Sequence, residues 1–171
     1  MKSRTIVLEK VFPHPPEQVW TALTDQRALA EWLMPNDFEA EHGAQFVFRV
    51  DPSGKGDGTT YCEIEQIEKP KLLAYTFQAP GMKAPTLVTW TLRQAPGGTR
   101  LRLEHSDPQS MVGWLQAKGL NKTWTTMTRA LLPRVLANIR EGHFSAGAVP
   151  IRERAYKVKT LPSGVELSPD R

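Results

Sequence analysis

The chain of 171 residues is poor in cysteine and has no long hydrophobic run, and each shortage excludes a class of protein. Its single cysteine, Cys62, rules out an intramolecular disulfide and any zinc site built from several cysteines. No stretch approaches the roughly 18 consecutive apolar residues that a membrane-spanning helix requires, and the N-terminus lacks the apolar core of a signal peptide. We therefore expect a cytoplasmic protein without a membrane span.

A strong excess of one charge is also missing. The 22 Lys and Arg residues exceed the 18 Asp and Glu residues by four, and no long basic run concentrates this excess. Nucleic-acid-binding proteins usually gather basic residues on one face, so no nucleic-acid partner is expected. Hydrophobic residues make up 40% of the chain and charged residues 23%, which is typical of one globular domain with a tail.

The N-terminal part of the chain predicts one strand and two short helices. The segment Ile6 to Phe12 is rich in β-branched and apolar residues and stops at a proline-rich stretch, which a central strand does not tolerate. Pro16 suits the first turn of a helix, and apolar residues follow at helical spacing up to Leu23. A second helix is expected from Arg27 to Leu33, where Pro35 soon ends it.

The middle of the chain alternates apolar and polar residues with period two, the pattern of half-buried strands. Short turn segments separate these strands, and links this short require antiparallel neighbours. We expect a curved antiparallel sheet of about six to seven strands with one apolar face. The apolar positions are Phe46, Phe48 and Val50, then Cys62 and Ile64, then Leu73, Tyr75 and Phe77, then Val88, Trp90 and Leu92, and then Leu101, Leu103 and His105.

A long helix is expected from Val112 to Arg140, because apolar residues recur there at three- and four-residue steps. Pro133 lies inside this helix and cannot donate a backbone hydrogen bond, so a kink is expected. Gly142 is expected to stop the helix and to end a domain of residues 1–142. Residues 143–171 are expected to form a tail, with either a small hairpin of Tyr156 to Thr160 and Val165 to Leu167 or disorder, and the domain is expected to fold without this tail.

No familiar motif for catalysis or cofactor binding is present. The segment Gly54 to Thr60 superficially resembles a phosphate-binding loop, but it lacks the Gly-Lys-Ser/Thr spacing and joins two strands, so a hairpin loop is expected. The four histidines share no metal-ligand spacing, and neither a metal nor a cofactor is expected. His105 is either hydrogen-bonded at the end of its strand or a polar contact to a ligand.

Aromatic residues and their neighbours gather on the elements that are expected to face one another. Two interpretations stay open: these residues form the core, or they line space left between a curved sheet and a kinked helix, as in small-molecule sites. The candidate ligand-binding residues are Trp32, Phe46, Phe48, Tyr75, Phe77, Trp90, His105, Trp124, Met127 and Leu131.

The order of the elements and several short motifs resemble the START-like, Bet v-like helix-grip (SRPBCC) superfamily, and more specifically the branch named after activators of the heat-shock protein 90 ATPase. The resemblance runs from about Ile6 to Gly142. It rests on Pro16 to Asp25, Leu29 to Leu33, Val88 to Leu92, Gly98 to His105 and the pair Gly113-Trp114. It implies an α+β helix-grip fold, in which a strand and two short helices precede a curved sheet wrapped around a C-terminal helix.

The resemblance implies a cavity protein, although relatives include lipid carriers, hormone binders, polyketide cyclases and co-chaperone domains. The leading hypothesis is binding of an apolar or aromatic small molecule between the sheet and the C-terminal helix, where Tyr75 and His105 orient the ligand. The second is a cyclase- or dehydratase-type enzyme on a polyketide-like or aromatic substrate, with His105 or Tyr75 as acid or base. We favour binding over catalysis.

The third hypothesis is a co-chaperone-like interaction domain. Eukaryotic activators carry an additional N-terminal domain, for which this chain has no room, so a chaperone partner is not expected. Whether the protein forms a homodimer stays open.

Overall fold

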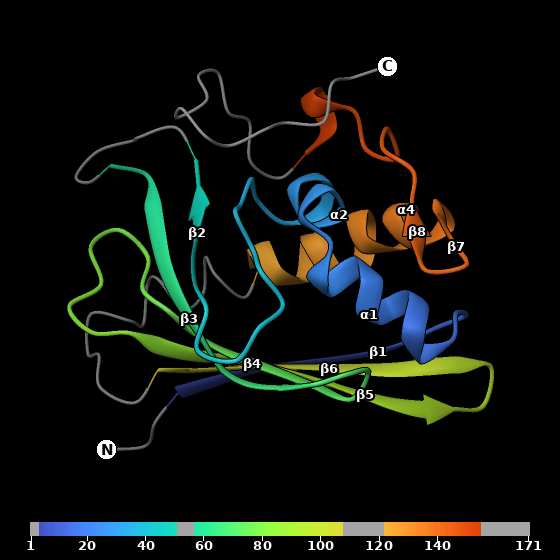
Figure 1. Ribbon diagram of the computed structural model, residues 1–171, viewed down its shortest axis with the longest axis horizontal. Helices are drawn as coiled ribbons and strands as arrows, with labels where there is room; N and C mark the ends of the chain where they lie inside the picture. The colour runs from blue at the N-terminus through green and yellow to red at the C-terminus, as the bar shows by residue number, and fades with distance from the viewer. Residues whose placement is uncertain (1–3, 51–56, 108–121, 155–171) are drawn as a thin grey trace.

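The computed structural model describes residues 4–50, 57–107 and 122–154, which form a sheet with helices over one face (Figure 1). Within these residues one sheet has six strands in the order β1-β6-β5-β4-β3-β2, and all neighbours are antiparallel. The strands are β1 (Arg4–Phe12), β2 (Gln45–Arg49), β3 (Thr59–Glu68), β4 (Leu72–Phe77), β5 (Thr86–Ala95) and β6 (Gly98–Asp107). The predicted α+β architecture is confirmed. Of the hairpin loop predicted between β2 and β3, residues 51–56 lie outside the described part.

The first strand lies at an edge of the sheet, beside the last strand of that sheet in the sequence. β1 pairs with β6 along its whole length, from Arg4 opposite Asp107 to Phe12 opposite Thr99. Gly98 permits the close approach at one end, because its φ is +149° and a Cβ there would overlap the carbonyl oxygen of Phe12. β1 therefore contributes one edge of the sheet and one wall of the space beneath the helices.

Two short helices follow β1, as the sequence predicts. They are α1 (Pro16–Thr24) and α2 (Gln26–Trp32). The carboxylate of Asp25 caps α2 by accepting hydrogen bonds from the backbone N–H groups of Arg27 and Ala28. Both helices lie over the inner face of the sheet with the C-terminal helix (Figure 1).

The C-terminal helix, residues 122–137 in the described part of the chain, contains a widened turn. After residues 122–126, η1 (Met127–Leu131) is π-helical and α4 (Leu132–Ala137) returns to α-geometry. The N–H of Leu132 bonds to the carbonyl of Met127, five residues back. Pro133 follows directly and lacks an N–H of its own, so the irregularity predicted at Pro133 takes the form of a π-turn. Residues 112–121 of the predicted helix lie outside the described part.

The C-terminal helix ends at Ala137, which corrects the predicted end at Arg140. The next residues form a small hairpin of β7 (Ile139–Arg140) and β8 (His143–Phe144). Glu141 and Gly142 connect these strands with φ values of 52° and 76°. Positive φ at both central residues is what a two-residue hairpin turn of type I′ requires. Gly142 therefore serves a hairpin turn and does not terminate the helix.

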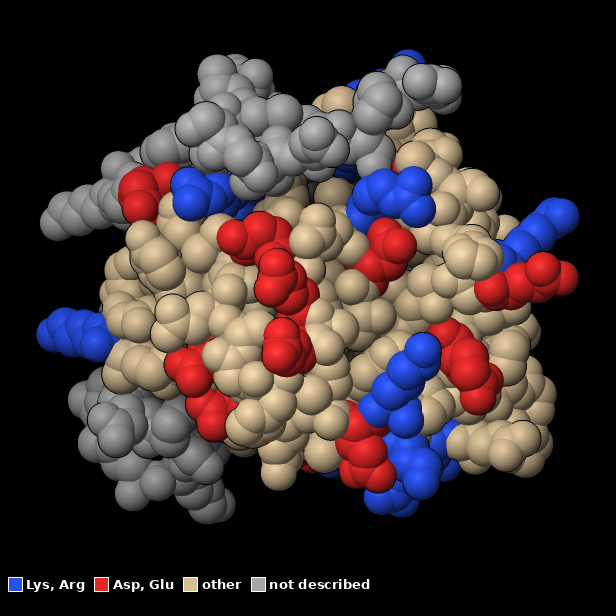
Figure 2. Space-filling model, viewed as in Figure 1, with Lys and Arg blue, Asp and Glu red and all other residues tan. Residues whose placement is uncertain are grey.

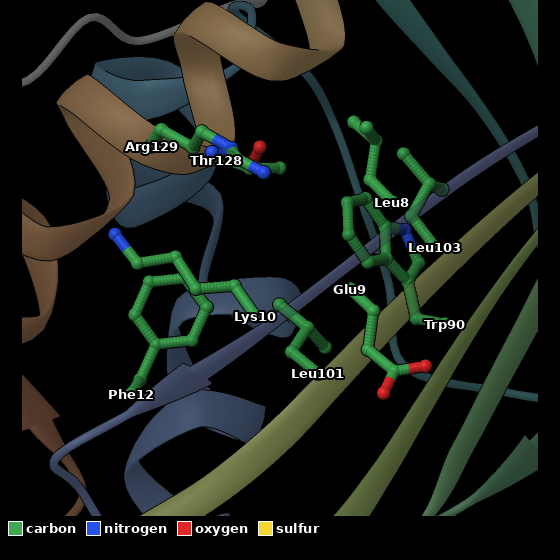
Figure 3. A pocket seen from close by; sticks show the side chains of 9 residues that line it. All are labelled: Leu8, Glu9, Lys10, Phe12, Trp90, Leu101, Leu103, Thr128 and Arg129. Atoms are coloured by element: carbon green, nitrogen blue, oxygen red, sulfur yellow. The ribbon is translucent and has the colours of Figure 1, made fainter.

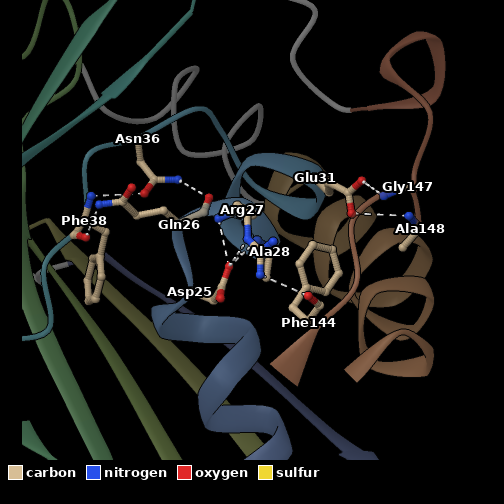
Figure 4. A network of polar contacts seen from close by, with 10 residues as sticks. All are labelled: Asp25, Gln26, Arg27, Ala28, Glu31, Asn36, Phe38, Phe144, Gly147 and Ala148. Atoms are coloured by element: carbon tan, nitrogen blue, oxygen red, sulfur yellow. Dashed lines mark hydrogen bonds and ion pairs between the residues drawn. The ribbon is translucent and has the colours of Figure 1, made fainter. Parts of the chain in front are cut away.

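A buried carboxylate on α2 holds the segment after this hairpin (Figure 4). Glu31 is only 1% exposed and accepts hydrogen bonds from the backbone N–H groups of Gly147 at 2.7 Å and Ala148 at 3.3 Å. The guanidinium of Arg154 pairs with the same carboxylate at 3.2 Å. A buried charge needs a partner of this kind, so Glu31 ties α2 to a segment more than a hundred positions away in the sequence.

Residues 143–154 also add to the hydrophobic core. Phe144 and Val149 are buried, and Arg27 donates to the carbonyl of Phe144 at 3.1 Å. The short helix η2 (Ile151–Glu153) follows. We therefore propose a domain boundary after Arg154 in place of the one expected at Gly142. Residues 155–171, with the hairpin predicted inside them, lie outside the described part.

The described surface carries charges of both signs. On the face drawn in Figure 2 acidic and basic side chains both occur, and no continuous basic surface covers that face. Glu9 pairs with Arg100 and with Arg102, each at 3.2 Å, which links β1 to β6. Exposed ion pairs of this kind contribute little stability. None of the described helices has both the length and the apolar composition needed to cross a bilayer.

Candidate functional site

The ten candidate ligand-binding residues all point into the interior. They come from α2, β2, β4, β5, β6 and the C-terminal helix, and none is more than 6% exposed. The structure therefore brings together residues that are far apart in the sequence, because the curved sheet and the helices converge on one space. These residues can line a ligand site only where their side chains leave part of this space empty.

The aromatic rings fill much of that space by packing edge against face. Trp90 lies between Trp32 and Trp124, with ring centroids 5.7 and 5.5 Å away. Phe46 contacts Tyr75 at 5.2 Å in the same edge-to-face manner. Pairs with this geometry stabilise a core beyond the area that they bury. The assignment of the ten residues to a ligand cavity thus remains a prediction.

His105 is held by hydrogen bonds to other core side chains. The indole N–H of Trp124 lies 3.1 Å from Nδ1 of His105, and Oγ1 of Thr86 lies 2.7 Å from Nε2. Because an indole nitrogen only donates, Nδ1 must accept, and the ring is neutral with its proton on Nε2. Thr86 in turn donates to the carbonyl of Phe77 at 2.6 Å. This chain of bonds makes His105 a structural link between β5, β6 and the C-terminal helix.

Tyr75 is the second polar group among the rings. Its hydroxyl oxygen accepts a hydrogen bond from the indole N–H of Trp90 at 3.0 Å. Burial raises the pKa of the phenol above its ordinary range, so the hydroxyl keeps its proton at physiological pH. Among the described residues that proton has no hydrogen-bond acceptor, which leaves Tyr75 one donor for a ligand.

A narrow crevice opens between the sheet strands β1, β5 and β6 and the C-terminal helix (Figure 3). Its free volume is about 10 Å³, which is room for about one water molecule. The residues that line it are Leu8, Glu9, Lys10, Phe12, Trp90, Leu101, Leu103, Thr128 and Arg129. Trp90 belongs both to this crevice and to the aromatic cluster, so the crevice leads from the surface to the interior rings.

Of the ten predicted residues only Trp90 lines this crevice, and the sequence analysis missed the others. One signal was available: Lys10 lies on the same face of β1 as Leu8 and Phe12, where the alternation calls for an apolar residue. Thr128 and Arg129 carry no comparable signal. Both lie in the π-turn, and wide turns of this kind recur at functional sites.

A larger hollow lies on the opposite, outer face of the sheet. It encloses about 530 Å³ and is lined by Glu65, Gln66, Ala74, Thr76, Pro85, Thr86, Leu87 and Thr89. Its lining comes from β3, β4, β5 and the segment before β5, with no contribution from a helix. Its short polar side chains form no cluster of acid, base or nucleophile, so we assign no chemistry to it.

Solved structures of other proteins share this fold. One is protein MLL2253 from Mesorhizobium loti, which is 34% identical and has a TM-score of 0.64, with 73% of this chain and 91% of that chain covered. Another is protein BH1534 from Bacillus halodurans, at 25% identity and a TM-score of 0.65, with 80% and 99% covered. DynU16, a protein of the dynemicin biosynthetic locus, is 22% identical with a TM-score of 0.63, and the match covers 82% of this chain and 49% of that one.

One family model matches most of the chain, whereas each motif of the sequence analysis covers only a short segment. No curated protein sequence matches, but the model of the "Activator of Hsp90 ATPase homolog 1-like protein" family matches residues 13–135. This match extends from the end of β1 into α4, which includes both short helices, the rest of the sheet and the π-turn. The resemblance drawn from the sequence is thereby confirmed, and the chain belongs to the Activator of Hsp90 ATPase homolog 1-like family.

Proposed function

We propose that the protein binds an apolar or aromatic small molecule in the crevice between the sheet and the C-terminal helix. The observation that carries the proposal is the apolar lining of the crevice, which continues through Trp90 into the aromatic cluster. Mostly apolar walls with a few polar groups are typical of small-molecule sites. The family and its fold support a binding domain of this kind.

The crevice must widen to admit such a ligand, because its present volume suits one water molecule. The wall formed by the π-turn is the part whose geometry departs from regular structure, and a return of Met127–Leu131 to α-geometry would shift Thr128 and Arg129 along it. A ligand that enters past Leu8 reaches Trp90, and behind Trp90 the free donor of Tyr75 offers one hydrogen bond.

The cyclase or dehydratase hypothesis needs an acid or a base inside the site. Both ring nitrogens of His105 are hydrogen-bonded to side chains of the protein, and the raised pKa of Tyr75 keeps its phenol from acting as a base and makes it a weaker acid than an ordinary tyrosine. A group that acts as a general acid or base must be free to exchange a proton with the substrate. These contacts favour binding over catalysis.

The test uses two neighbouring residues on opposite faces of β1. Leu8 lines the crevice, whereas Val7 is 45% exposed on the other face. Leu8→Trp should obstruct the crevice and weaken binding of the uncharged fluorophore N-phenyl-1-naphthylamine, followed by its own emission, by about tenfold or more. Val7→Trp should leave the dissociation constant unchanged. Non-saturable binding by the wild type, or equal binding by both variants, would refute this site.

A further inference from the structure

Two cationic side chains line the crevice from its two sides (Figure 3). Lys10 comes from β1, on the inward face that it shares with Leu8, and Arg129 comes from the π-turn of the C-terminal helix. Lys10 is partly buried and Arg129 is exposed. Their positions place positive charge beside the apolar side chains of the crevice.

Neither cation has an acidic partner in the described part of the chain. Of the described residues that line the crevice, only Glu9 is acidic, and its carboxylate already binds Arg100 and Arg102 at 3.2 Å each. The ammonium group of Lys10 lies 5.2 Å from the ring centre of Phe12, a weaker contact than a buried ion pair provides. The crevice thus offers two uncompensated positive charges to whatever enters it.

From this arrangement we infer that the crevice selects an amphiphile with a single anionic head, such as a carboxylate. The head binds between Lys10 and Arg129, and the apolar body lies against Leu8, Leu103 and Trp90. The inference rests on the proposed function and adds the chemical class of the ligand to it. An arginine fork suits a carboxylate or a phosphate, because it can donate two parallel hydrogen bonds.

An inward-facing lysine also has a second explanation. Charged residues on edge strands hinder unwanted pairing with other sheets, and β1 is an edge strand. That explanation accounts for Lys10 alone and makes no use of Arg129. It predicts that removal of both charges changes aggregation, whereas our inference predicts a change in which ligands bind.

The experiment compares decanoate, decylphosphonate and decan-1-ol as competitors of N-phenyl-1-naphthylamine, all at concentrations where they stay monomeric. Each partly exposed ion pair contributes a factor of about two to five, so Lys10→Gln/Arg129→Gln should bind decanoate about tenfold more weakly and decan-1-ol equally well. Lys10→Arg/Arg129→Lys keeps both charges and should keep the affinity for decanoate. Decylphosphonate should bind with the same affinity as decanoate if charge alone is recognised. It should bind more weakly than decanoate if the site is specific for a carboxylate.

The matched control is Lys83→Gln/Arg93→Gln, which removes two exposed cations that do not line the crevice. It changes the net charge equally and should leave all affinities unchanged. Equal losses in the two double variants would show general electrostatic attraction and overturn the inference, as would a crevice variant that binds decanoate normally. If the neutral fluorophore itself does not bind, the proposed function fails and the inference fails with it.

Discussion

Single polar atoms determine how the rings of the interior are oriented. His105 accepts from Trp124 and donates to Thr86, and the hydroxyl of Tyr75 accepts from Trp90. In an apolar interior each of these bonds prevents a desolvated polar group from being left unpaired. The aromatic cluster is therefore a specific arrangement, in which two tryptophans are each tied to one partner on the sheet.

The first prediction concerns His105. His105→Phe leaves the indole N–H of Trp124 without its acceptor, so the free energy of unfolding should fall by about 1–3 kcal/mol. His42→Phe, at an exposed position, should change it by less than about 0.5 kcal/mol. Urea denaturation measures both. The double variant His105→Phe/Trp124→Phe should lose less than the sum of its single variants, and strict additivity would contradict the hydrogen bond.

The second prediction concerns alkaline pH. Burial raises the pKa of Tyr75 above its ordinary 10.0, and burial together with the charge of Asp37 raises that of Cys62 above 9.0. The folded state then keeps protons that the unfolded chain loses, so this contribution to stability is complete below about pH 9 and declines above it. For each of the two groups, the free energy of unfolding should fall by up to about 1.4 kcal/mol per pH unit.

Tyrosine variants isolate the contribution of one group to this decline. Tyr75→Phe should show a shallower loss of stability between about pH 10 and 11 than the wild type, because it lacks the buried phenol. Tyr61→Phe, at a position that is 57% exposed, should match the wild type. The same slope in all three proteins would mean that Tyr75 ionises normally in the folded state.

Among the elements, the π-turn lines the crevice, and the segment after the C-terminal helix completes the core. Period-two alternation predicted β2 to β6, because each of these strands has one face in the core, whereas β1 was predicted from its β-branched and apolar composition. The turn at Glu141 and Gly142 was missed because Ile139 continues the apolar stripe of the helix and is buried in either conformation. The pairing of Glu31 with Arg154 could not be predicted, since no local pattern links α2 to residues so distant in sequence.

The third prediction concerns the end of the domain. A chain that ends at Gly142 loses buried Phe144 and Val149, which should lower the free energy of unfolding by about 3–6 kcal/mol. It also leaves Glu31 buried without Arg154. A chain that ends at Arg154 keeps all of these contacts and should unfold near the midpoint of the full chain. Equal thermal midpoints for both truncations would place the boundary at Gly142.

In the described part of the molecule, the curved sheet and the helices bury one core, and a crevice opens beside it at the β1 edge. The ten predicted residues occupy this interior, and their identity follows from the alternation of each strand and the stripe of the helix. The crevice itself depends on how β1, β6 and the π-turn meet. Sequence patterns report which residues are buried, but they do not report where packing is incomplete.

The most direct test of a binding site at the crevice is a nuclear magnetic resonance titration of ¹⁵N-labelled protein with N-phenyl-1-naphthylamine. The account predicts saturable shifts of the Trp90 indole N–H and of the amides of Leu8 and Leu103, with little change at Trp20 on α1. Shifts confined to Thr76 and Thr89, on the outer face of the sheet, would place the ligand elsewhere and contradict the account. A spectrum that does not change at saturating fluorophore would contradict it as well.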